Sequence, residues 1–310
     1  MSFATALVTG GTGFIGAALS RRLVQMGVRT TLLARPRALI PLGCDVVTIL
    51  DLSRQSIAHA LAGRRFDVVF HLAAYGVAPS DRDPRQTFDV NIAGTDAVVY
   101  AAVETGAKAV IYLGSCSEYR DLVPGQFVEE DAPIGPDLLY GGSKAVAGLW
   151  GQTLAARLGV SFQWLRLFNV FGPGEAASRL IPALIARLRA QERVALSPGE
   201  QVRDFLYIDD AVTGILLAAE ASMEGRLGPF NLCSGQPIKV KEIALAVADT
   251  MDKPYDLLGF GDLNYRPDDI FWLVGSAGRF QNATGFRPHT SLLAGIEKMI
   301  TADQVHAEGK

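Results

Sequence analysis

Cysteine is scarce in this sequence. The 310 residues include three cysteines, Cys44, Cys116 and Cys233, whose positions fit neither a metal-ligand spacing nor an even disulfide framework. Because such cysteine usage is typical of a reducing compartment, we expect a cytoplasmic protein without a structural metal.

An excess of either charge is also absent. The 29 basic and 32 acidic residues give a net charge of -3, which leaves no basic stripe for a nucleic acid or an anionic membrane. Nowhere do about 18 apolar residues run together, and the first residues lack a basic region followed by a long apolar segment. We therefore expect neither a membrane span nor a secretion signal in this sequence.

Short apolar runs alternate with longer helical stretches up to about residue 170. The runs TALVTG, TTLLAR, DVVTIL, DVVFHLAA, KAVIYLGS and SFQWLRLFNV are typical of strands. This rhythm predicts an α/β fold with a Rossmann-type doubly wound parallel sheet. Beyond it we expect a helix near residues 178–192, and VRDFLYIDDAVTGILLAAE indicates a strand that leads into a helix.

The less regular second part indicates a smaller C-terminal domain interleaved with the first. We expect residues 1–170 and about 204–232 to form the larger domain. About residues 171–203 and 233–310 would then form the smaller one.

The segment LVTGGTGFIGAAL places Gly10, Gly13 and Gly16 directly after an expected strand and at the start of an amphipathic helix. Such glycines allow a tight turn and a close approach of the backbone to a pyrophosphate at the helix N-terminus. The segment predicts dinucleotide binding, and the alternative is a purely structural glycine turn.

The end of the second expected strand, TLLARPRA, offers Arg35 and Arg37 and no acid. A carboxylate at this place suits the ribose hydroxyls of NAD, whereas a guanidinium suits the 2'-phosphate of NADP. We therefore expect NADP(H) rather than NAD(H), although two solvated surface arginines are the alternative. Asp51 follows the next strand and is expected to meet the adenine amino group.

The segment LLYGGSKAV places Tyr140 and Lys144 on one face of an expected helix. A nearby ammonium should lower the pKa of the phenol and make it a usable acid and base. Ser115, at the tip of the strand in IYLGSCSEYRD, could hold the substrate oxygen meanwhile. Taken alone, the tyrosine and lysine could also be an ordinary surface pair.

These segments, together with HLAA, VNIAGT, LRLFNVFGPG, VRDFLYIDD and YRPDDIFWLVGSAGRFQNATGFRP, resemble the extended short-chain dehydrogenase/reductases that act on nucleotide sugars. The resemblance covers nearly the whole chain in the family's order. It implies a Rossmann domain for the cofactor, a small C-terminal domain for the nucleoside diphosphate sugar, and catalysis between them.

The resemblance also implies roles for single residues. Ser115, Tyr140 and Lys144 match the family's catalytic triad, and Asn91 matches the residue that positions the catalytic helix and its water network. Further cofactor contacts would come from Phe14, Ile15, Leu52, Leu72, Ala73, Ala74 and Phe168. Substrate contacts would come from Ser117, Asn169, Arg179, Arg203 and Arg266, of which Arg203 and Arg266 match the arginines that hold the diphosphate. Many relatives have asparagine at the position of Arg179, for which a surface arginine is the alternative.

Two positions after Ser115 bear on the type of reaction. In the 4,6-dehydratases of the family these positions are Asp and Glu, whereas here they are Cys116 and Ser117. GDP-fucose synthase, which is similar in this segment, uses a cysteine and a histidine where this chain has Ser117 and Arg179. Dehydration and epimerisation at carbons 3 and 5 are therefore not expected.

What remains is hydride transfer at one sugar carbon. Because Arg35 and Arg37 favour the consumable cofactor, we expect an NADPH-dependent 4-ketoreductase of a nucleotide-linked 4-keto-6-deoxy sugar. A nucleotide-sugar 4-epimerase with tightly bound NAD(P) is the first alternative. A non-catalytic NAD(P)-sensing protein is the second.

Two expected helices are apolar or small on more than one face. They lie within residues 86–105 and 138–158. Because a helix that buries one side on the sheet needs a partner for the other, the sequence predicts a homodimer.

Overall fold

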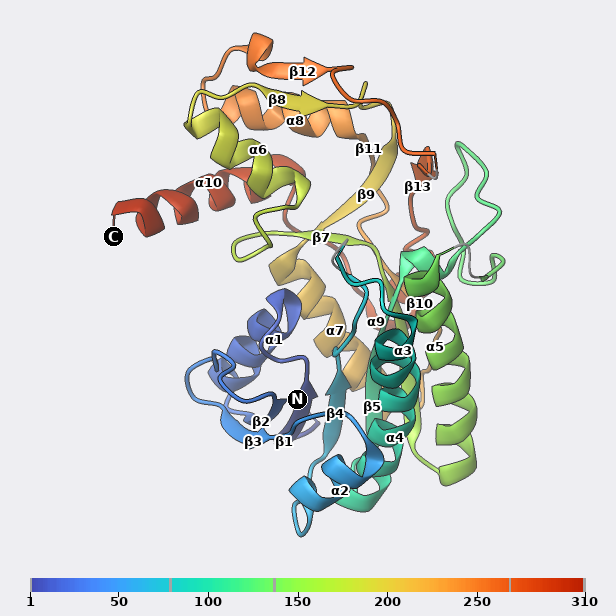
Figure 1. The fold of residues 1–310 in the computed structure, drawn as a ribbon. Helices are drawn as coiled ribbons and strands as arrows, with labels where there is room; N and C mark the ends of the chain where they lie inside the picture. The colour runs from blue at the N-terminus through green and yellow to red at the C-terminus, as the bar shows by residue number, and fades with distance from the viewer. Residues whose placement is uncertain (1, 78–79, 136–137, 268, 309–310) are drawn as a thin grey trace.

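The computed structural model describes residues 2–77, 80–135, 138–267 and 269–308, with side chains to residue 303 (Figure 1). Its larger part is a seven-stranded sheet in the order β3-β2-β1-β4-β5-β6-β10. All neighbouring strands of this sheet are parallel, which confirms the expected fold class. The strands are β1 (Thr5–Thr9), β2 (Arg29–Ala34), β3 (Asp45–Thr48), β4 (Val68–His71), β5 (Ala109–Ser115), β6 (Ser161–Leu167) and β10 (Phe230–Leu232).

The central strands are buried along their whole length. Every residue of β4 and β5 is buried because helices cover both faces of the sheet. The strand order reverses between β1 and β4. In open α/β sheets, ligands bind at such a reversal, outside the carboxyl ends of the strands.

Helices pack on both faces of this sheet (Figure 1). One face is covered by α1 (Phe14–Gln25), α7 (Ile208–Met223) and the short α9 (Gly278–Thr284). The other is covered by α2 (Arg54–Leu61), α4 (Gly94–Thr105) and α5 (Leu139–Leu158), with α3 (Pro84–Thr87) and a π-helical segment η1 (Phe88–Ala93) leading into α4. The sheet is thus the middle of three layers.

A smaller lobe lies above the carboxyl ends of the strands (Figure 1). In it β9 (Val202–Tyr207) pairs with β7 (Asn169–Phe171), β11 (Pro237–Lys239) and β13 (Trp272–Leu273). A separate pair joins β8 (Val194–Leu196) to β12 (Leu258–Phe260). The helices are α6 (Leu180–Arg189), α8 (Val240–Thr250) and α10 (Leu292–Glu308), with a short 3-10 helix η3 (Tyr255–Leu257).

The expected single strand over residues 161–170 is wrong, because the chain forms two strands there. Phe168, the residue after β6, donates from its backbone amide to Leu232 O of β10 at 3.1 Å. At this point β6 ends and the chain leaves the large sheet. Asn169 then pairs with Phe205 of β9. The break transfers the chain from the larger sheet to the smaller one.

Each of the two lobes is built from more than one segment of the chain. β9 pairs in the smaller sheet, whereas α7, which follows it directly, packs on β5 and β6. One buried apolar cluster accordingly runs from α1 and α7 into α6 and α8. Because sheet membership assigns no ligand to either lobe, the division into a cofactor domain and a substrate domain stays a prediction. Within the described residues, the longest apolar helices fall short of a membrane span.

Candidate functional site

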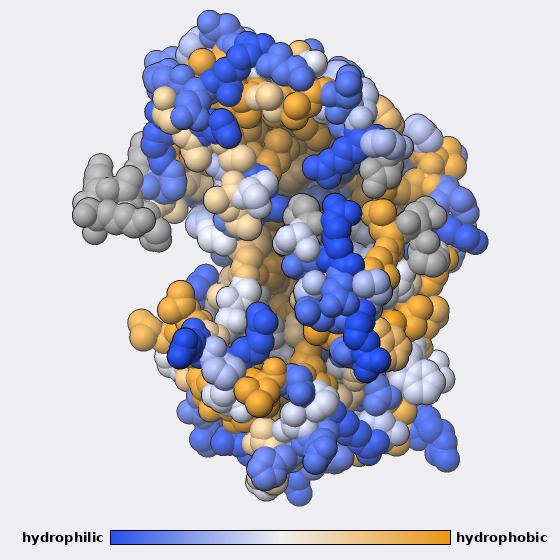
Figure 2. Space-filling view, in the orientation of Figure 1, coloured by the Kyte–Doolittle hydropathy of each residue, from blue (hydrophilic) through white to orange (hydrophobic). Residues whose placement is uncertain are grey.

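The site predicted from the sequence lies where β1, β4, β5 and β6 end. The molecular surface is hollowed between the two lobes at this level (Figure 2). The residues described below reach this region from loops at the carboxyl ends of the strands and from the N-terminal turn of α5.

The glycine loop is shaped by close contacts at two of its three glycines. Gly10 has a positive φ of 70°, and a Cβ there would lie 2.6 Å from Ala73 N. A Cβ on Gly16 would overlap the carbonyl oxygen of Gly10. These two glycines are required by the fold itself.

Gly13 has no comparable constraint from within the chain. Among the described residues, the nearest atom to a Cβ there would be Gly10 O at 3.5 Å, an ordinary contact. Gly13 precedes α1 as its N-cap with no side-chain hydrogen bond from the described residues, and the first turn contains no acid. An open glycine beside an uncapped helix N-terminus fits the pyrophosphate of a dinucleotide.

Arg35 and Arg37 are exposed just beyond the end of β2. The turn is closed by Ala38 N, which donates to Arg35 O at 3.3 Å, and Arg37 has a left-handed φ of 63°. Asp51 is exposed after β3, and hydrogen bonds from Ser53 and Ser56 lower its pKa. All three side chains reach solvent at the adenosine end of the expected cofactor site.

The apolar residues expected around a cofactor occupy the same edge of the sheet. Phe14 and Ile15 form the first turn of α1, Leu52 lies against Gly94, and Phe168 is buried at the end of β6. The half-buried residues Leu72, Ala73 and Ala74 directly follow β4.

Ser115 ends β5 and caps the short 3-10 helix η2 (Cys116–Glu118). Its Oγ accepts a hydrogen bond from Ser117 N at 3.1 Å, and the residue is 8% exposed. Burial, and then the charge of Asp204, raise the pKa of the Cys116 thiol to about 12. Cys116 therefore remains a protonated packing residue, and Ser117 is half-buried beside it.

Lys144 lies in α5, one turn after Tyr140, and is buried. Its Nζ lies 4.3 Å from the centre of the Tyr112 ring, and Tyr112 OH donates to Lys144 O at 2.9 Å. Burial lowers the pKa of Lys144 to about 8, against the opposing charge of Glu118. Lys144 therefore holds its proton less firmly than an exposed lysine does.

The expectation of a lowered pKa for Tyr140 is wrong for the chain by itself. Burial raises this pKa above its usual value of 10, and the charge of Glu118 raises it further. The Ser115 hydroxyl and the Arg179 guanidinium act in the opposite direction. Loss of hydration at the phenolate thus outweighs stabilisation by its neighbours.

Asn91 connects the loop after β4 to the helix of Tyr140. It lies in η1, and its amide accepts from Tyr75 N and donates to Tyr75 O, both at 2.8 Å. It also donates to Ser143 Oγ at 2.8 Å, and that hydroxyl donates to Tyr140 O at the same distance. A π-helix supplies one extra residue per turn, which presents Asn91 to both partners.

His71, at the end of β4, is buried and neutral. Burial, and then the charge of Lys144, lower its pKa to about 3. The Thr95 hydroxyl donates to Asn91 O and so accepts from His71 Nε2, which lies 3.0 Å away. The proton is therefore on Nε2, and Nδ1 accepts from Thr9 Oγ1 at 2.7 Å.

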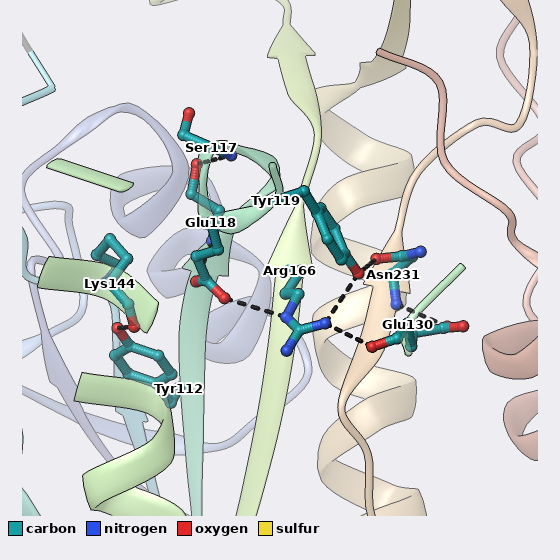
Figure 3. Close-up of polar contacts among 9 residues, drawn as sticks. Tyr112, Ser117, Glu118, Tyr119, Glu130, Lys144, Arg166 and Asn231 are labelled. Atoms are coloured by element: carbon teal, nitrogen blue, oxygen red, sulfur yellow. Dashed lines mark hydrogen bonds and ion pairs between the residues drawn. The ribbon is translucent and has the colours of Figure 1, made fainter. Parts of the chain in front are cut away.

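Sequence reasoning missed a buried polar network around Glu118 and Arg166 (Figure 3). Glu118, which is fully buried, accepts from Ser115 N at 2.8 Å and from Arg166 Nε at 3.0 Å. Arg166 also donates to Tyr119 OH and to the carbonyl oxygen of Glu130. An arginine in the middle of the apolar run SFQWLRL was the available signal, because a buried charge must be paired.

Four of the expected substrate residues belong to the smaller lobe. Arg179 is held by Glu175 at 3.5 Å, and Arg203 lies 3.8 Å from Asp269. Asn169 donates to Asp204 O at 3.0 Å, and the exposed Arg266 donates its amide to Asp269 at 3.1 Å. The structure thus brings Arg179 and Arg203 close to the tip of β5, where their charges act on Tyr140 and Cys116 respectively.

Glu175 is a further residue that the sequence did not indicate. Its side chain is 7% exposed, and burial raises its pKa to about 7 despite Arg179. No group of three or more metal-ligating side chains occurs in the part of the chain that the structure describes.

Comparison with known proteins decides the family. Residues 6–233 match the family described as the NAD dependent epimerase/dehydratase family. The chain belongs to this family. The resemblance found in the sequence is therefore confirmed.

Relatives within the epimerase/dehydratase family differ in the reaction that their names describe. The dTDP-glucose 4,6-dehydratase of Streptomyces griseus is 30% identical over 308 residues, which cover 94% of this chain and 91% of that protein. The GDP-6-deoxy-D-mannose reductase of Pseudomonas aeruginosa is 26% identical, with 95% of each chain covered. The solved structure of MoeE5 in complex with UDP-glucose and NAD is 28% identical, with a TM-score of 0.86 over 98% of this chain and 99% of that one.

These matches extend over nearly the full length of each relative. The chain is an NAD(P)-dependent enzyme of nucleotide sugars.

Proposed function

We propose that this family member is an NADPH-dependent 4-ketoreductase of a nucleoside-diphosphate-linked 4-keto-6-deoxy sugar. The observation that carries the choice of a net reduction is the pair of exposed arginines, Arg35 and Arg37, beyond β2. Bidentate guanidinium contacts suit a 2'-phosphate, and NADPH is the cofactor that a reductase consumes.

The surroundings of Ser115 argue against dehydration. Neither Cys116 nor Ser117 can exchange a proton as a carboxylic acid would, and the Cys116 thiol is buried with a raised pKa. Glu118 is acidic but faces inward, where Ser115 N and Arg166 occupy both of its oxygens. These contacts support hydride transfer without elimination of water.

When bound, the cofactor supplies a hydride to the ketone carbon. Tyr140 donates its phenolic proton to the ketone oxygen, so that one hydride and one proton convert the carbonyl to a hydroxyl group. The raised pKa of Tyr140 keeps this proton in place before the reaction. Ser115 donates a hydrogen bond to the same oxygen, and Lys144 stabilises the phenolate that remains.

The smaller lobe would hold the nucleotide part of the substrate. Arg203 and Arg266 offer charged donors for the diphosphate, and Asn169 and Arg179 face the sugar. On this basis we assign residues 171–203 and 233–310 to a substrate domain, and residues 1–170 with 204–232 to the cofactor domain.

A 4-epimerase with tightly bound cofactor is the second candidate. MoeE5, which is similar over almost its whole length, was solved with UDP-glucose and NAD, and this supports an NAD-based alternative. An epimerase returns its hydride to the substrate, so it consumes no cofactor. A non-catalytic NAD(P)-sensing protein would have no need of Ser115, Tyr140 and Lys144 together.

Deuterium transfer separates these candidates. The purified protein is mixed with NADPH that bears deuteride at carbon 4 and with dTDP-, GDP- or CDP-linked 4-keto-6-deoxyhexoses. We expect one deuterium per turnover on the former ketone carbon, with stoichiometric oxidation of NADPH, measured by mass spectrometry and absorbance. Interconversion of 4-hydroxy sugars by cofactor that stays bound would establish the epimerase instead.

Replacement of the proton donor tests the mechanism. Tyr140→Phe should lower turnover at least about a hundredfold, as loss of a general acid does, while cofactor affinity changes little. Tyr255→Phe, at an exposed tyrosine of the smaller lobe, is the matched control and should keep the wild-type rate. A near-normal rate in Tyr140→Phe would show that the triad is misassigned.

A further inference from the structure

Glu118 occupies a position that neither the proposed chemistry nor the substrate contacts use. It is a fully buried carboxylate three residues after Ser115. One oxygen accepts from Ser115 N at 2.8 Å and the other accepts from Arg166 Nε at 3.0 Å (Figure 3). Because both oxygens accept hydrogen bonds, this geometry suits the ionised form.

The chain makes room for this carboxylate with a glycine. A Cβ on Gly114, the residue before Ser115, would overlap Glu118 Oε1 and would lie close to Trp164 Nε1. Any larger residue at position 114 would therefore displace the carboxylate from the Ser115 amide. The last residues of β5 and the carboxylate thus form one unit.

The same turn is held against the catalytic helix. A Cβ on Gly141, next to Tyr140, would overlap the carbonyl oxygen of Ser117, so that α5 packs directly on η2. Tyr112, three residues before Ser115, donates to Lys144 O and presents its ring to Lys144 Nζ. Glu118 therefore lies at the junction of β5, β6 and α5.

We propose that Glu118 is a positioning residue, which fixes Ser115 through its amide and places one buried negative charge beside the Tyr140–Lys144 pair. This inference rests on the proposed function, in which those two residues transfer the proton. The groups whose charges interact with Glu118 are Arg166 from β6, Tyr112 from β5, Lys144 and Tyr140 from α5, and Cys116 and Tyr119 from its own turn.

The negative charge of Glu118 determines the direction in which it shifts the pKa of Lys144 and of Tyr140. The carboxylate raises the pKa of Lys144 by stabilising its ammonium, and it raises the pKa of Tyr140 by opposing its phenolate. Burial raises the pKa of Glu118 itself to about 7, against Arg166. Removal of the charge should therefore lower the pKa of both Tyr140 and Lys144.

The first test reads this charge without any turnover. In protein labelled with [13Cε]lysine, the Lys144 resonance is assigned by its absence in Lys144→Met and is titrated by NMR. We expect the Lys144 pKa to fall by about one unit in Glu118→Gln, as for loss of a close opposite charge. An unchanged Lys144 pKa would overturn the inference, whether or not the protein proves to be a ketoreductase.

Glu130→Gln is the matched control. Glu130 is also buried and belongs to the same network, but it meets Arg166 through its carbonyl oxygen and pairs its carboxylate with Arg279. Its carboxylate also accepts from Asn231 N at 2.9 Å. The control should leave the Lys144 titration unmoved, and an equal fall there would reduce Glu118 to a merely structural residue.

The second test uses turnover with deuterated NADPH and the keto-sugar nucleotides named above. In Glu118→Gln the alkaline limb of kcat should move to lower pH, because both Tyr140 and Lys144 lose their protons more readily. Glu118→Asp keeps the charge but shortens the reach to Ser115, so it should keep the Lys144 pKa and lower kcat about tenfold or more. A loss of rate without any shift of the alkaline limb in Glu118→Gln would contradict the electrostatic part of the inference.

If Glu118→Gln does not fold, the Lys144 titration is measured in Glu118→Asp instead. An unchanged Lys144 pKa is expected there because the charge is kept, and a fall of that pKa would contradict the inference.

Discussion

Single side chains at the end of β2 are the basis of the cofactor preference that we propose. Arg35 and Arg37 lie in an exposed turn, and Arg37 has a left-handed backbone conformation that bulky residues rarely adopt. A single arginine can bind a phosphate in a bidentate manner, which is the chemistry that the proposal assigns to this turn.

Arg35→Ala should weaken the binding of NADPH at least about tenfold and leave NADH binding nearly unchanged, because the 2'-phosphate occurs in NADPH alone. Fluorescence titration with both cofactors measures the two affinities. Arg29→Ala, at the opposite end of the same strand, is the control, since Arg29 pairs with Asp45 on the surface. Equal losses for both cofactors, or a wild-type preference for NADH, would remove the argument for NADP.

Residues that belong to a sequence motif could be predicted from the sequence. Properties that depend on burial in the folded chain could not. Ser115 lies at the predicted strand tip. Tyr140 and Lys144 lie four residues apart on the predicted helix, where spacing alone places them on one face. The inward direction of Glu118 depends on Gly114 and on Arg166, which is 48 residues away along the chain. The raised pKa of Tyr140 likewise follows from tertiary burial, which no local pattern encodes.

At the scale of elements, the first strand is tied to its neighbour by one carboxylate. Asp67, just before β4, accepts from Ala4 N and Thr5 N at 2.8 Å and from Thr5 Oγ1 at 3.0 Å. These contacts close the amino-terminal edge of the sheet between β1 and β4. The segments TALVTG and DVVFHLAA predicted both strands, but not this contact between them across 62 residues.

Asp67→Asn should lower the free energy of unfolding by about 1 kcal/mol at neutral pH, through weakened hydrogen bonds to a charged acceptor. Burial opposes ionisation of Asp67, but its donors outweigh it and lower the pKa below 3.8. The stabilisation is therefore present above that pH and is lost as the pH falls through the lowered folded-state pKa.

Urea denaturation followed by tryptophan fluorescence at decreasing pH measures this difference. The gap between wild type and Asp67→Asn should close on acidification. Asp45→Asn, which removes an exposed ion pair with Arg29, is the control and should change stability little. A gap that is the same at every pH would show that the charge of Asp67 is not responsible.

At the scale of the whole molecule, α5 and η1 leave an apolar surface uncovered. A groove of about 420 Å³ is lined there by Phe88, Leu139, Val146 and Leu149 among others. Leu149 is 51% exposed and Val146 is 48% exposed, and apolar residues are visible over α5 on the right-hand side of the molecule (Figure 2). This surface lies within the two helical stretches from which the sequence predicts a homodimer.

Leu149→Lys should convert a dimer of the wild-type protein into monomers, because a buried unpaired ammonium would replace an apolar contact at the twofold axis. Light scattering at micromolar concentration measures the mass of each variant. Leu293→Lys, at an equally exposed leucine of α10, is the control and should stay dimeric. A monomeric wild-type protein would contradict the predicted assembly.

β10 pairs with β6 but is synthesised well after it, and this order has a consequence during translation. β6 ends at Leu167, but its outer neighbour β10 begins only at Phe230, after the chain has built β7, β8, β9 and α7. During translation at roughly 5–20 residues per second, β6 is therefore an open edge for some seconds. An open apolar edge can pair with another nascent chain, so this interval is when chaperones would protect the protein most.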